Sequence, residues 1–195
     1  IYHVPLMLQE QGLCDILNLD CNATDLLEQW RTMAYNLDTL SKEVHIAMVG
    51  KYTNLSDAYL SVIKSLQHAA MAVNRKLVID WIEASHLESN WPDSREREEA
   101  WGLLKPASGV LVPGGFGDRG IKGKLKAISY ARTSKTPYLG ICLGMQLAVV
   151  EFAQNVLGID NATSTEFDEK AENPLIIFMP EINPSHTVSY THLTL

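Results

Sequence analysis

From residue 44 onward, the sequence alternates between short apolar runs and longer stretches with the period of a helix. Four apolar runs have the length of strands, over residues 44–49, 77–82, 109–112 and 138–141. This alternation is typical of βαβ units. We therefore expect an α/β fold, a doubly wound and mostly parallel sheet flanked by helices. Such sheets bind their ligands at the carboxyl ends of the strands.

The connecting stretches predict the helices of this fold. Ser56 or Asp57 is positioned to cap a helix that runs to Val73, because apolar residues recur at helical spacing between them. Further helices are expected over residues 95–104, 122–132 and 143–155. Beyond them the pattern weakens. Residues 161–168 are polar and typical of a loop, and residues 175–179 are apolar enough for one more strand.

A cysteine stands at the junction between the fourth expected strand and the helix that follows it. In Gly-Ile-Cys-Leu-Gly-Met-Gln, residues 140–146, glycine lies two residues before and two residues after Cys142. Small neighbours allow the sharp turn and close chain approach of a nucleophile elbow, and a helix start favours the thiolate. We interpret Cys142 as a nucleophile. The alternative is a buried structural cysteine at a helix start.

A glycine-rich loop, Pro-Gly-Gly-Phe-Gly-Asp-Arg-Gly over residues 113–120, follows the third expected strand. It does not continue into the Gly-Lys-Ser/Thr of a phosphate-binding P-loop. An oxyanion loop is the better interpretation, in which the N–H of Gly115 or Phe116 faces the developing charge and the N–H of Leu143 is the second donor. A plain surface turn is the alternative. The loop and Cys142 both follow expected strands, so we expect them at one edge of the sheet.

A base for the thiol is not evident among the six histidines. His86 follows the second expected strand, whereas neither His186 nor His192 has a carboxylate two residues on. Lys51, after the first expected strand, fits a solvated lysine as well as an anion-binding one. No convincing Cys–His–carboxylate set can be assembled, so either the base is missing or the chain is inactive.

Charge and cysteine usage argue against several classes of partner. The net charge is −7 and no basic block is present, which disfavours nucleic acid. No apolar run has membrane-spanning length. The three cysteines, Cys14, Cys21 and Cys142, lack metal-ligand spacing, so no metal is expected. We expect a reduced, cytoplasmic setting.

The two ends of the chain differ from its middle. Residues 24–40 predict an amphipathic helix whose apolar stripe needs a partner, and residues 41–43 are the most plausible domain boundary. Residues 182–195 show neither helical nor strand periodicity. Because the first residue is Ile1 rather than methionine, we expect the chain to be a fragment.

Two motifs together, GICLGMQ (140–146) and VLVPGGFGDRG (110–120), resemble the class I glutamine amidotransferases. Longer segments are similar to the CTP synthase family, over residues 1 to about 181: IYHVPLMLQEQGL, VGKYTNLSDAYLSVIKSLQHA, PYLGICLGMQLAVVEFAQNVLG and NATSTEFD. The resemblance implies a flavodoxin-like three-layer domain that is incomplete at its C-terminus. Residues 1–41 would be the end of an amidoligase domain with its linker, 42–181 a partial glutaminase domain, and 182–195 a non-native tail.

The resemblance also implies roles for individual residues. Cys142 would form a thioester with L-glutamine and release ammonia, Gly115 would contact glutamine and the oxyanion, and Glu166 would contact the glutamine backbone. The segment that binds glutamine would comprise Leu143, Gly144, Met145 and Gln146. In the family, the ammonia aminates UTP to CTP with ATP and Mg²⁺, GTP stimulates the glutaminase step, and the enzymes are tetramers. No cofactor is expected for this chain itself.

After Pro180 and Glu181 the sequence departs from the family, which continues to a His-x-Glu pair and to an arginine that contacts glutamine. We therefore expect no CTP synthesis and negligible glutaminase activity from this chain alone. Two alternatives remain. One is another cysteine hydrolase on the same fold, such as a γ-glutamyl peptidase. The other is a non-catalytic interaction module that docks a partner through residues 24–40.

Overall fold

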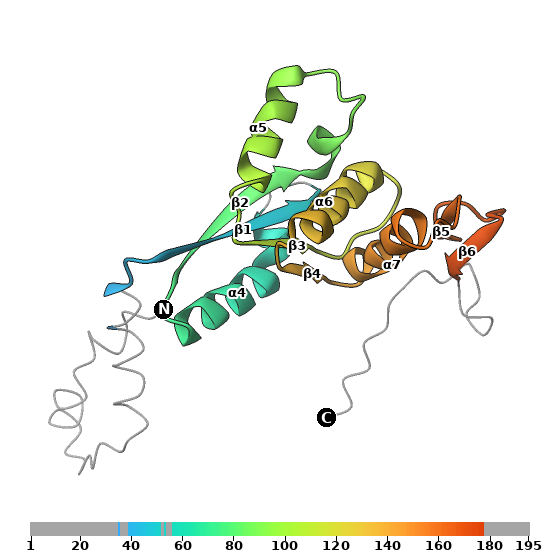
Figure 1. The fold of residues 1–195 in the computed structure, drawn as a ribbon. Coiled ribbons are helices and arrows are strands. Elements are labelled where there is room, and N and C mark those ends of the chain that lie inside the picture. The colour runs from blue at the N-terminus through green and yellow to red at the C-terminus, as the bar shows by residue number, and fades with distance from the viewer. Residues whose placement is uncertain (1–34, 36–38, 52, 54–55, 178–195) are drawn as a thin grey trace, which may run out of the picture. The chain divides into compact units, whose positions relative to one another are not determined.

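The computed structural model describes residues 35, 39–51, 53 and 56–177 (Figure 1). The chain divides into two compact units. The first comprises Ile1–Ile46 and Asn54–Ile79, and the second comprises Ala47–Thr53 and Asp80–Leu195. Most of the helix expected over residues 24–40, and all of residues 182–195, lie outside the described residues. No helix in the described part combines the length and apolar character needed to cross a membrane.

The four expected strands form one sheet, and their order confirms the α/β prediction. The strands are β1 (Glu43–Gly50), β2 (Lys76–Glu83), β3 (Gly109–Val112) and β4 (Tyr138–Gly140). Their order is β2-β1-β3-β4, as in flavodoxin-like sheets, which bind ligands where the order reverses between β1 and β3. Strands β3 and β4 are parallel, with Val112 opposite Gly140, so the glycine loop and Cys142 leave the sheet at the same end.

The helices agree with the sequence pattern to within a few residues at each end. They are α4 (Leu60–Ala72), α5 (Ser94–Leu104), α6 (Ile121–Ser134) and α7 (Leu143–Asn155), with the 3-10 turns η1 (Ser56–Tyr59) and η2 (Ala84–Leu87). The predicted cap at Ser56 or Asp57 is wrong. A 3-10 turn occupies those positions, and the N-cap of α4 is Tyr59, whose side chain caps nothing. Asp93, by contrast, caps α5 by accepting from the N–H groups of Arg95 and Glu96.

The prediction of a loop over residues 161–168 is wrong in part. Strand β5 (Ala162–Ser164) pairs in parallel with β6 (Asn173–Ile176) in a separate two-stranded sheet. Three small or polar residues carry no readable hydrophobic alternation, so this strand is set by its pairing partner. Strand β6 begins two residues before the expected strand, and the last residues of that prediction, 178–179, lie outside the described part.

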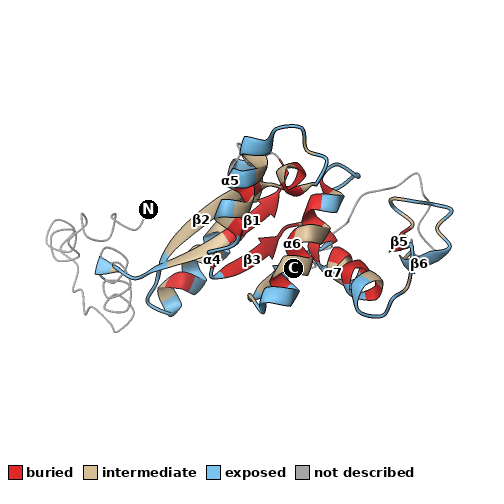
Figure 2. Ribbon diagram, turned by 45° about the horizontal axis from the view of Figure 1, so that its top comes forward, coloured by how far each residue is buried: buried red, intermediate tan, exposed pale blue. Residues whose placement is uncertain are grey.

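The core of the second unit lies around β3, all four residues of which are buried (Figure 2). Buried side chains from the end of β1, from β3 and from the inner faces of α6 and α7 meet there, among them Ala47, Val49, Val110, Val112, Ala127, Ala131, Leu143 and Leu147. Burial of each large aliphatic side chain stabilises the fold by roughly 1.5–3 kcal/mol. The end of β3 that carries the glycine loop is therefore anchored in this core, next to the start of α7.

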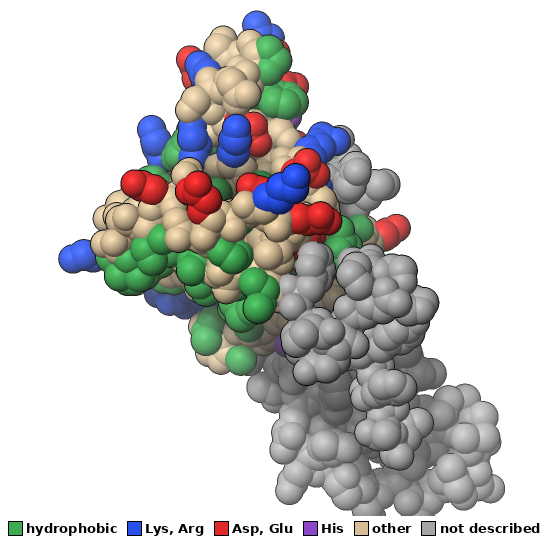
Figure 3. All heavy atoms as spheres, turned by 90° about the vertical axis from the view of Figure 1, so that its right-hand side faces the viewer, with side chains coloured by type: hydrophobic (Ala, Val, Ile, Leu, Met, Phe, Trp, Pro, Cys, Tyr) green, Lys and Arg blue, Asp and Glu red, His purple; other side chains and the backbone are tan. Residues whose placement is uncertain are grey.

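Apolar side chains remain exposed on the outer face of α7 and beside β6. They include Val149, Phe152, Val156, Leu157 and Ile177. Figure 3 shows a group of hydrophobic side chains in the lower part of the face that it draws. Strand β4 is also the last strand in the sheet order, and Leu139 in it is 54% exposed. The described residues therefore leave this face of α7 without an apolar cover.

Candidate active site

Cys142 lies between the end of β4 and the start of α7, in a backbone conformation that few residues adopt. Its φ is 51° and its ψ is −107°, and its side chain is exposed. Such a conformation costs about 1–3 kcal/mol and persists only where neighbouring structure imposes it. Here the N–H of Ile141 donates to Val112 O at 3.0 Å, and the N–H of Gln146 donates to Cys142 O at 3.0 Å. The strand and the helix thus hold the cysteine in the strained turn of a nucleophile elbow.

The two glycines that flank Cys142 allow α7 to begin this close to the sheet. A Cβ on Gly144 would lie 2.1 Å from Val112 O, and a Cβ on Gly140 would lie 2.5 Å from the backbone of Gly144 and Met145. Any side chain at either position would force the helix start away from β3 or β4. The predicted need for small residues around Cys142 is therefore confirmed in atomic terms.

Two polar contacts hold the same helix. The hydroxyl of the half-buried Tyr138 donates to Gly144 O at 2.7 Å, and partial burial raises the pKa of Tyr138, so it remains a neutral donor. Further along α7, Glu151 is 1% exposed and accepts two hydrogen bonds of 2.9 Å from Arg132 of α6. Burial alone would raise the pKa of Glu151, but the hydrogen bonds led by Arg132 hold it below its ordinary value. Helices α6 and α7 are thereby tied together behind the cysteine.

The glycine loop lies directly beside the cysteine. A Cβ on Gly114 would be 3.4 Å from the Cβ of Cys142, and a Cβ on Gly115 would be 3.9 Å from Cδ2 of Leu143. Phe116, at the tip of the loop, is 71% exposed. The structure thus brings together the two sequence features that pointed to one sheet edge.

Lys51 holds this loop from the end of β1. Its Nζ donates to Phe116 O at 2.7 Å and to Gly117 O at 3.1 Å, and the residue is buried. The solvated-lysine interpretation is therefore wrong. A trans peptide directs its N–H opposite to its carbonyl. By binding these two carbonyls, Lys51 sets the direction in which the next N–H groups point.

Lys124 of α6 is a second buried lysine, which the sequence motifs did not indicate. It is 1% exposed, and its Nζ lies 3.7 Å from where a Cβ of Gly115 would be. Burial, followed by the charge of Lys51, lowers the pKa of Lys124 to about 8, against the opposing charges of Glu83 and Glu166. The helical spacing of the sequence does indicate that Lys124 is buried. Lys124 falls in register with Ala127, Ile128 and Ala131 on the buried face of α6.

The other predicted site residues vary in exposure. Leu143 and Gly144 are buried, Gln146 is half-buried, and Met145 is 55% exposed at the first turn of α7. Glu166 is exposed in the turn after β5, where its N–H donates to Ser164 Oγ at 3.2 Å and its charge reaches Lys124. The next residue, Phe167, packs against the core and anchors that turn.

The structure places no imidazole next to the thiol within the described residues. His86 has Glu88 two residues on, but its Nε2 lies 3.6 Å from Glu96 Oε2. Its ring packs at a tilt against Trp91, with the ring centroids 4.8 Å apart. In the part of the chain that the structure describes, no hydrogen bond joins Cys142 to a histidine. His186 and His192 lie outside the described residues.

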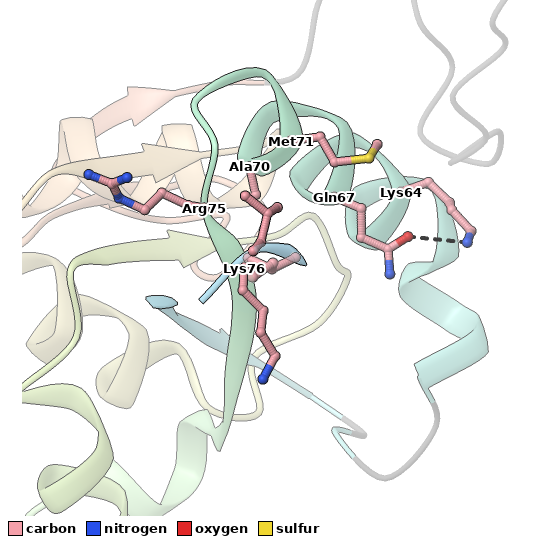
Figure 4. Close-up of a pocket in the computed structure, with 8 residues that line it drawn as sticks. Lys64, Gln67, Ala70, Met71, Arg75 and Lys76 are labelled. Atoms are coloured by element: carbon pink, nitrogen blue, oxygen red, sulfur yellow. Dashed lines mark hydrogen bonds between the residues drawn. The ribbon is translucent and has the colours of Figure 1, made fainter. Parts of the chain in front are cut away.

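The first unit contains a pocket of about 260 Å³ beside α4 (Figure 4). Its lining is Leu40, Lys64, Gln67, Ala70, Met71, Arg75, Lys76 and Leu77. Within it, Lys64 donates to Gln67 at 3.1 Å, and Lys76 is paired with Glu43 at 3.0 Å. Basic side chains line this pocket, but no cysteine, serine or threonine does. The candidate active site is therefore the Cys142 edge of the second unit.

Comparisons with known proteins agree with this geometry. The family model for glutamine amidotransferase class-I matches residues 54–192. CTP synthase 1 of Homo sapiens is 50% identical over 192 residues, which cover 94% of this chain and 32% of the relative. CTP synthase of Dictyostelium discoideum is 46% identical over 206 residues, covering 95% and 36%. The chain spans about a third of the length of the curated relatives it matches.

A solved structure shares the fold. The glutaminase domain of Trypanosoma brucei CTPS with bound acivicin superposes with a TM-score of 0.64 at 37% identity, over 73% of this chain and 53% of that chain. The resemblance drawn from the motifs is thus confirmed at the level of sequence and of fold. With a family match over residues 54–192 added to a cysteine elbow and an adjoining glycine loop, the chain belongs to the class-I glutamine amidotransferase family.

Proposed function

We propose that Cys142 is the nucleophile of a glutaminase site. Its thiolate adds to the side-chain carbonyl carbon of glutamine, and the carbonyl electron pair moves onto oxygen. As this adduct collapses, the amide nitrogen takes up a proton from water and leaves as ammonia, and a thioester remains. Water then hydrolyses the thioester to glutamate and returns the thiol.

The remaining roles follow from the neighbours of the thiol. The N–H groups of Gly115 and Leu143 are the proposed oxyanion donors, because the Gly114 Cβ position lies 3.4 Å from the Cβ of Cys142 and Leu143 begins α7. The close approach of the glycine loop to Cys142 is the observation that supports the proposal most directly. Phe116 is the alternative oxyanion donor of the loop. As the family resemblance suggests, residues 143–146 bind glutamine and Glu166 contacts its backbone.

The use of the ammonia is a further proposal. The curated relatives are named CTP synthases. By resemblance, ammonia released at Cys142 aminates UTP to CTP in an ATP- and Mg²⁺-dependent step, with GTP as activator, in a cytoplasmic homotetramer. For the 195-residue chain alone we propose that turnover is negligible, because no described imidazole contacts the thiol.

Covalent labelling by acivicin tests the nucleophile. We expect one equivalent of mass to be added at Cys142, slowed by L-glutamine but not by D-glutamine, and lost in Cys142→Ser. Slowing by γ-glutamyl dipeptides but not by glutamine would instead indicate a γ-glutamyl peptidase. A folded protein that resists labelling would support the interaction module and overturn the proposal.

Turnover is measured separately, as ammonia released from glutamine over hours. We expect a rate indistinguishable from that of Cys142→Ser, even where acivicin labels the unsubstituted chain. Sustained release above that background would contradict the proposal that the chain alone is inactive.

A further inference from the structure

The glycine loop rests against a buried cation. Lys124 is 1% exposed and is among the largest fully buried side chains of the described residues. An ammonium taken out of water loses several kcal/mol of hydration unless charges or hydrogen bonds replace it. The apolar positions of α6 in register with it, at 127, 128 and 131, supply neither. The position therefore needs a reason outside the packing of the helix.

The surroundings of Nζ give that reason. It lies 3.7 Å from the Cβ position of Gly115, while the Cβ position of Gly114 lies 3.4 Å from the Cβ of Cys142. Two consecutive glycines thus separate the ammonium from the residue that carries the thiol. Cδ2 of Leu143 also lies 3.9 Å from the Cβ position of Gly115, so the ammonium and the start of α7 approach the same glycine.

The charges that face Lys124 come from three other elements. Lys51 at the end of β1 opposes its charge, and Glu83 at the end of β2 and Glu166 after β5 favour it. The balance leaves the pKa of Lys124 at about 8, so near neutral pH the ammonium is protonated but only modestly stabilised. An additional negative charge beside Gly115 would be attracted to this ammonium, because Lys124 is largely shielded from solvent.

We propose that Lys124 is a positioning residue that acts across Gly115, where its ammonium stabilises the negative charge formed when Cys142 adds to a carbonyl. The inference rests on the proposed function. No proton leaves Lys124 in this step: the sulfur–carbon bond forms, the carbonyl electron pair moves to oxygen, and the cation lowers the energy of that oxyanion.

The test compares two reagents at one sulfur. Acivicin needs the glutamine site, whereas iodoacetamide alkylates the thiolate by direct displacement of iodide and needs no oxyanion loop. The ratio of their rate constants at Cys142, resolved by peptide mass, therefore removes changes in thiol ionisation. The ratio is measured from pH 6.5 to 9.5 in the 195-residue chain and in Lys124→Met, Lys124→Arg and Lys122→Met.

At pH 7 we expect the ratio to fall about tenfold in Lys124→Met, which corresponds to about 1.4 kcal/mol, and less than twofold in Lys124→Arg. Lys122→Met removes an exposed lysine from the same helix and should change nothing. As the pH rises through about 8, the unsubstituted chain should lose its advantage over Lys124→Met, because Lys124 loses its proton. Lys124→Arg should keep its ratio, because a guanidinium stays charged.

Equal ratios for the unsubstituted chain and Lys124→Met at every pH would overturn the inference while leaving the nucleophile intact. If Lys124→Met does not fold, the test uses Lys124→Arg instead. The inference is overturned if the ratio of acivicin to iodoacetamide rate constants falls with pH as steeply in Lys124→Arg as in the unsubstituted chain. If iodoacetamide labels Cys142 and acivicin does not, the proposed function itself fails. The inference then fails with it, because no oxyanion forms.

Discussion

Helices α4 and α7 each contain 13 residues, and both show the apolar spacing of an amphipathic helix. They differ in how many residues they bury and in how they begin. Only Ala70 of α4 is buried, whereas α7 buries six residues, including Glu151. Helix α4 begins without a side-chain cap, and α7 begins at a strained cysteine held by two strands. The apolar spacing of a helix therefore does not determine how many of its side chains the fold buries. Cys142 lies at the start of the helix that buries more of its side chains.

Among the tests of this difference, Gly144→Ala is expected to change the free energy of unfolding the most. The new Cβ would lie 2.1 Å from Val112 O, so the start of α7 must leave β3. We expect the free energy of unfolding in urea to fall by more than about 3 kcal/mol. Gly102→Ala in α5, where nothing lies within 4 Å, is the control and should stabilise by up to about 1 kcal/mol. A Gly144→Ala protein as stable as the original would break the comparison.

Truncation of one leucine on each helix compares them directly. Leu147 of α7 is 1% exposed, so Leu147→Ala should cost about 2–4 kcal/mol of unfolding free energy. Leu60 of α4 is 54% exposed, and Leu60→Ala should change that free energy by less than about 0.5 kcal/mol. The measurement is urea denaturation followed by circular dichroism. Similar losses in the two variants would show that α4 is anchored as firmly as α7.

A pH-dependent loss is expected for Arg132→Met, which leaves Glu151 buried without its partner. The pKa of Glu151 is held below its ordinary value of 4.5 in the fold. Its pairing therefore stabilises above that pH, and the contribution is lost as the pH falls through the folded pKa. The Tm difference from the original should be clear at pH 7 and shrink below pH 4.5. Lys64→Met on the exposed face of α4 should show no such dependence. A difference that persists at pH 3 would contradict the linkage.

The smallest expected effect concerns Lys51→Met. Two loop carbonyls, those of Phe116 and Gly117, lose their donor, which should cost about 1 kcal/mol of unfolding free energy. The local effect should be larger, with faster amide hydrogen exchange over residues 114–118. Lys76→Met, which removes an exposed ion pair with Glu43 in the other unit, is the control. Unchanged exchange in the loop would mean that Lys51 does not hold it.

Several parts of the site were readable in the sequence because they depend on local chemistry. A glycine on each side of Cys142 indicated the sharp turn, and the apolar runs on either side indicated the strand and helix that make it. The glycine loop was recognised in the same way. The cap of α4 was predicted wrongly because a short polar segment can form a 3-10 turn as readily as a helical turn.

What the sequence determined by itself is the alternation of strands and helices, and the cysteine between glycines at one strand end, since both depend on residues near one another in the chain. Only the tertiary structure decided that Lys51 and Lys124 stand behind the glycine loop, and that β5 pairs at all. These features join residues tens of positions apart. A lysine has the same letter whether it is hydrated or buried, and the cost of removing its charge from water depends on what the fold packs around it.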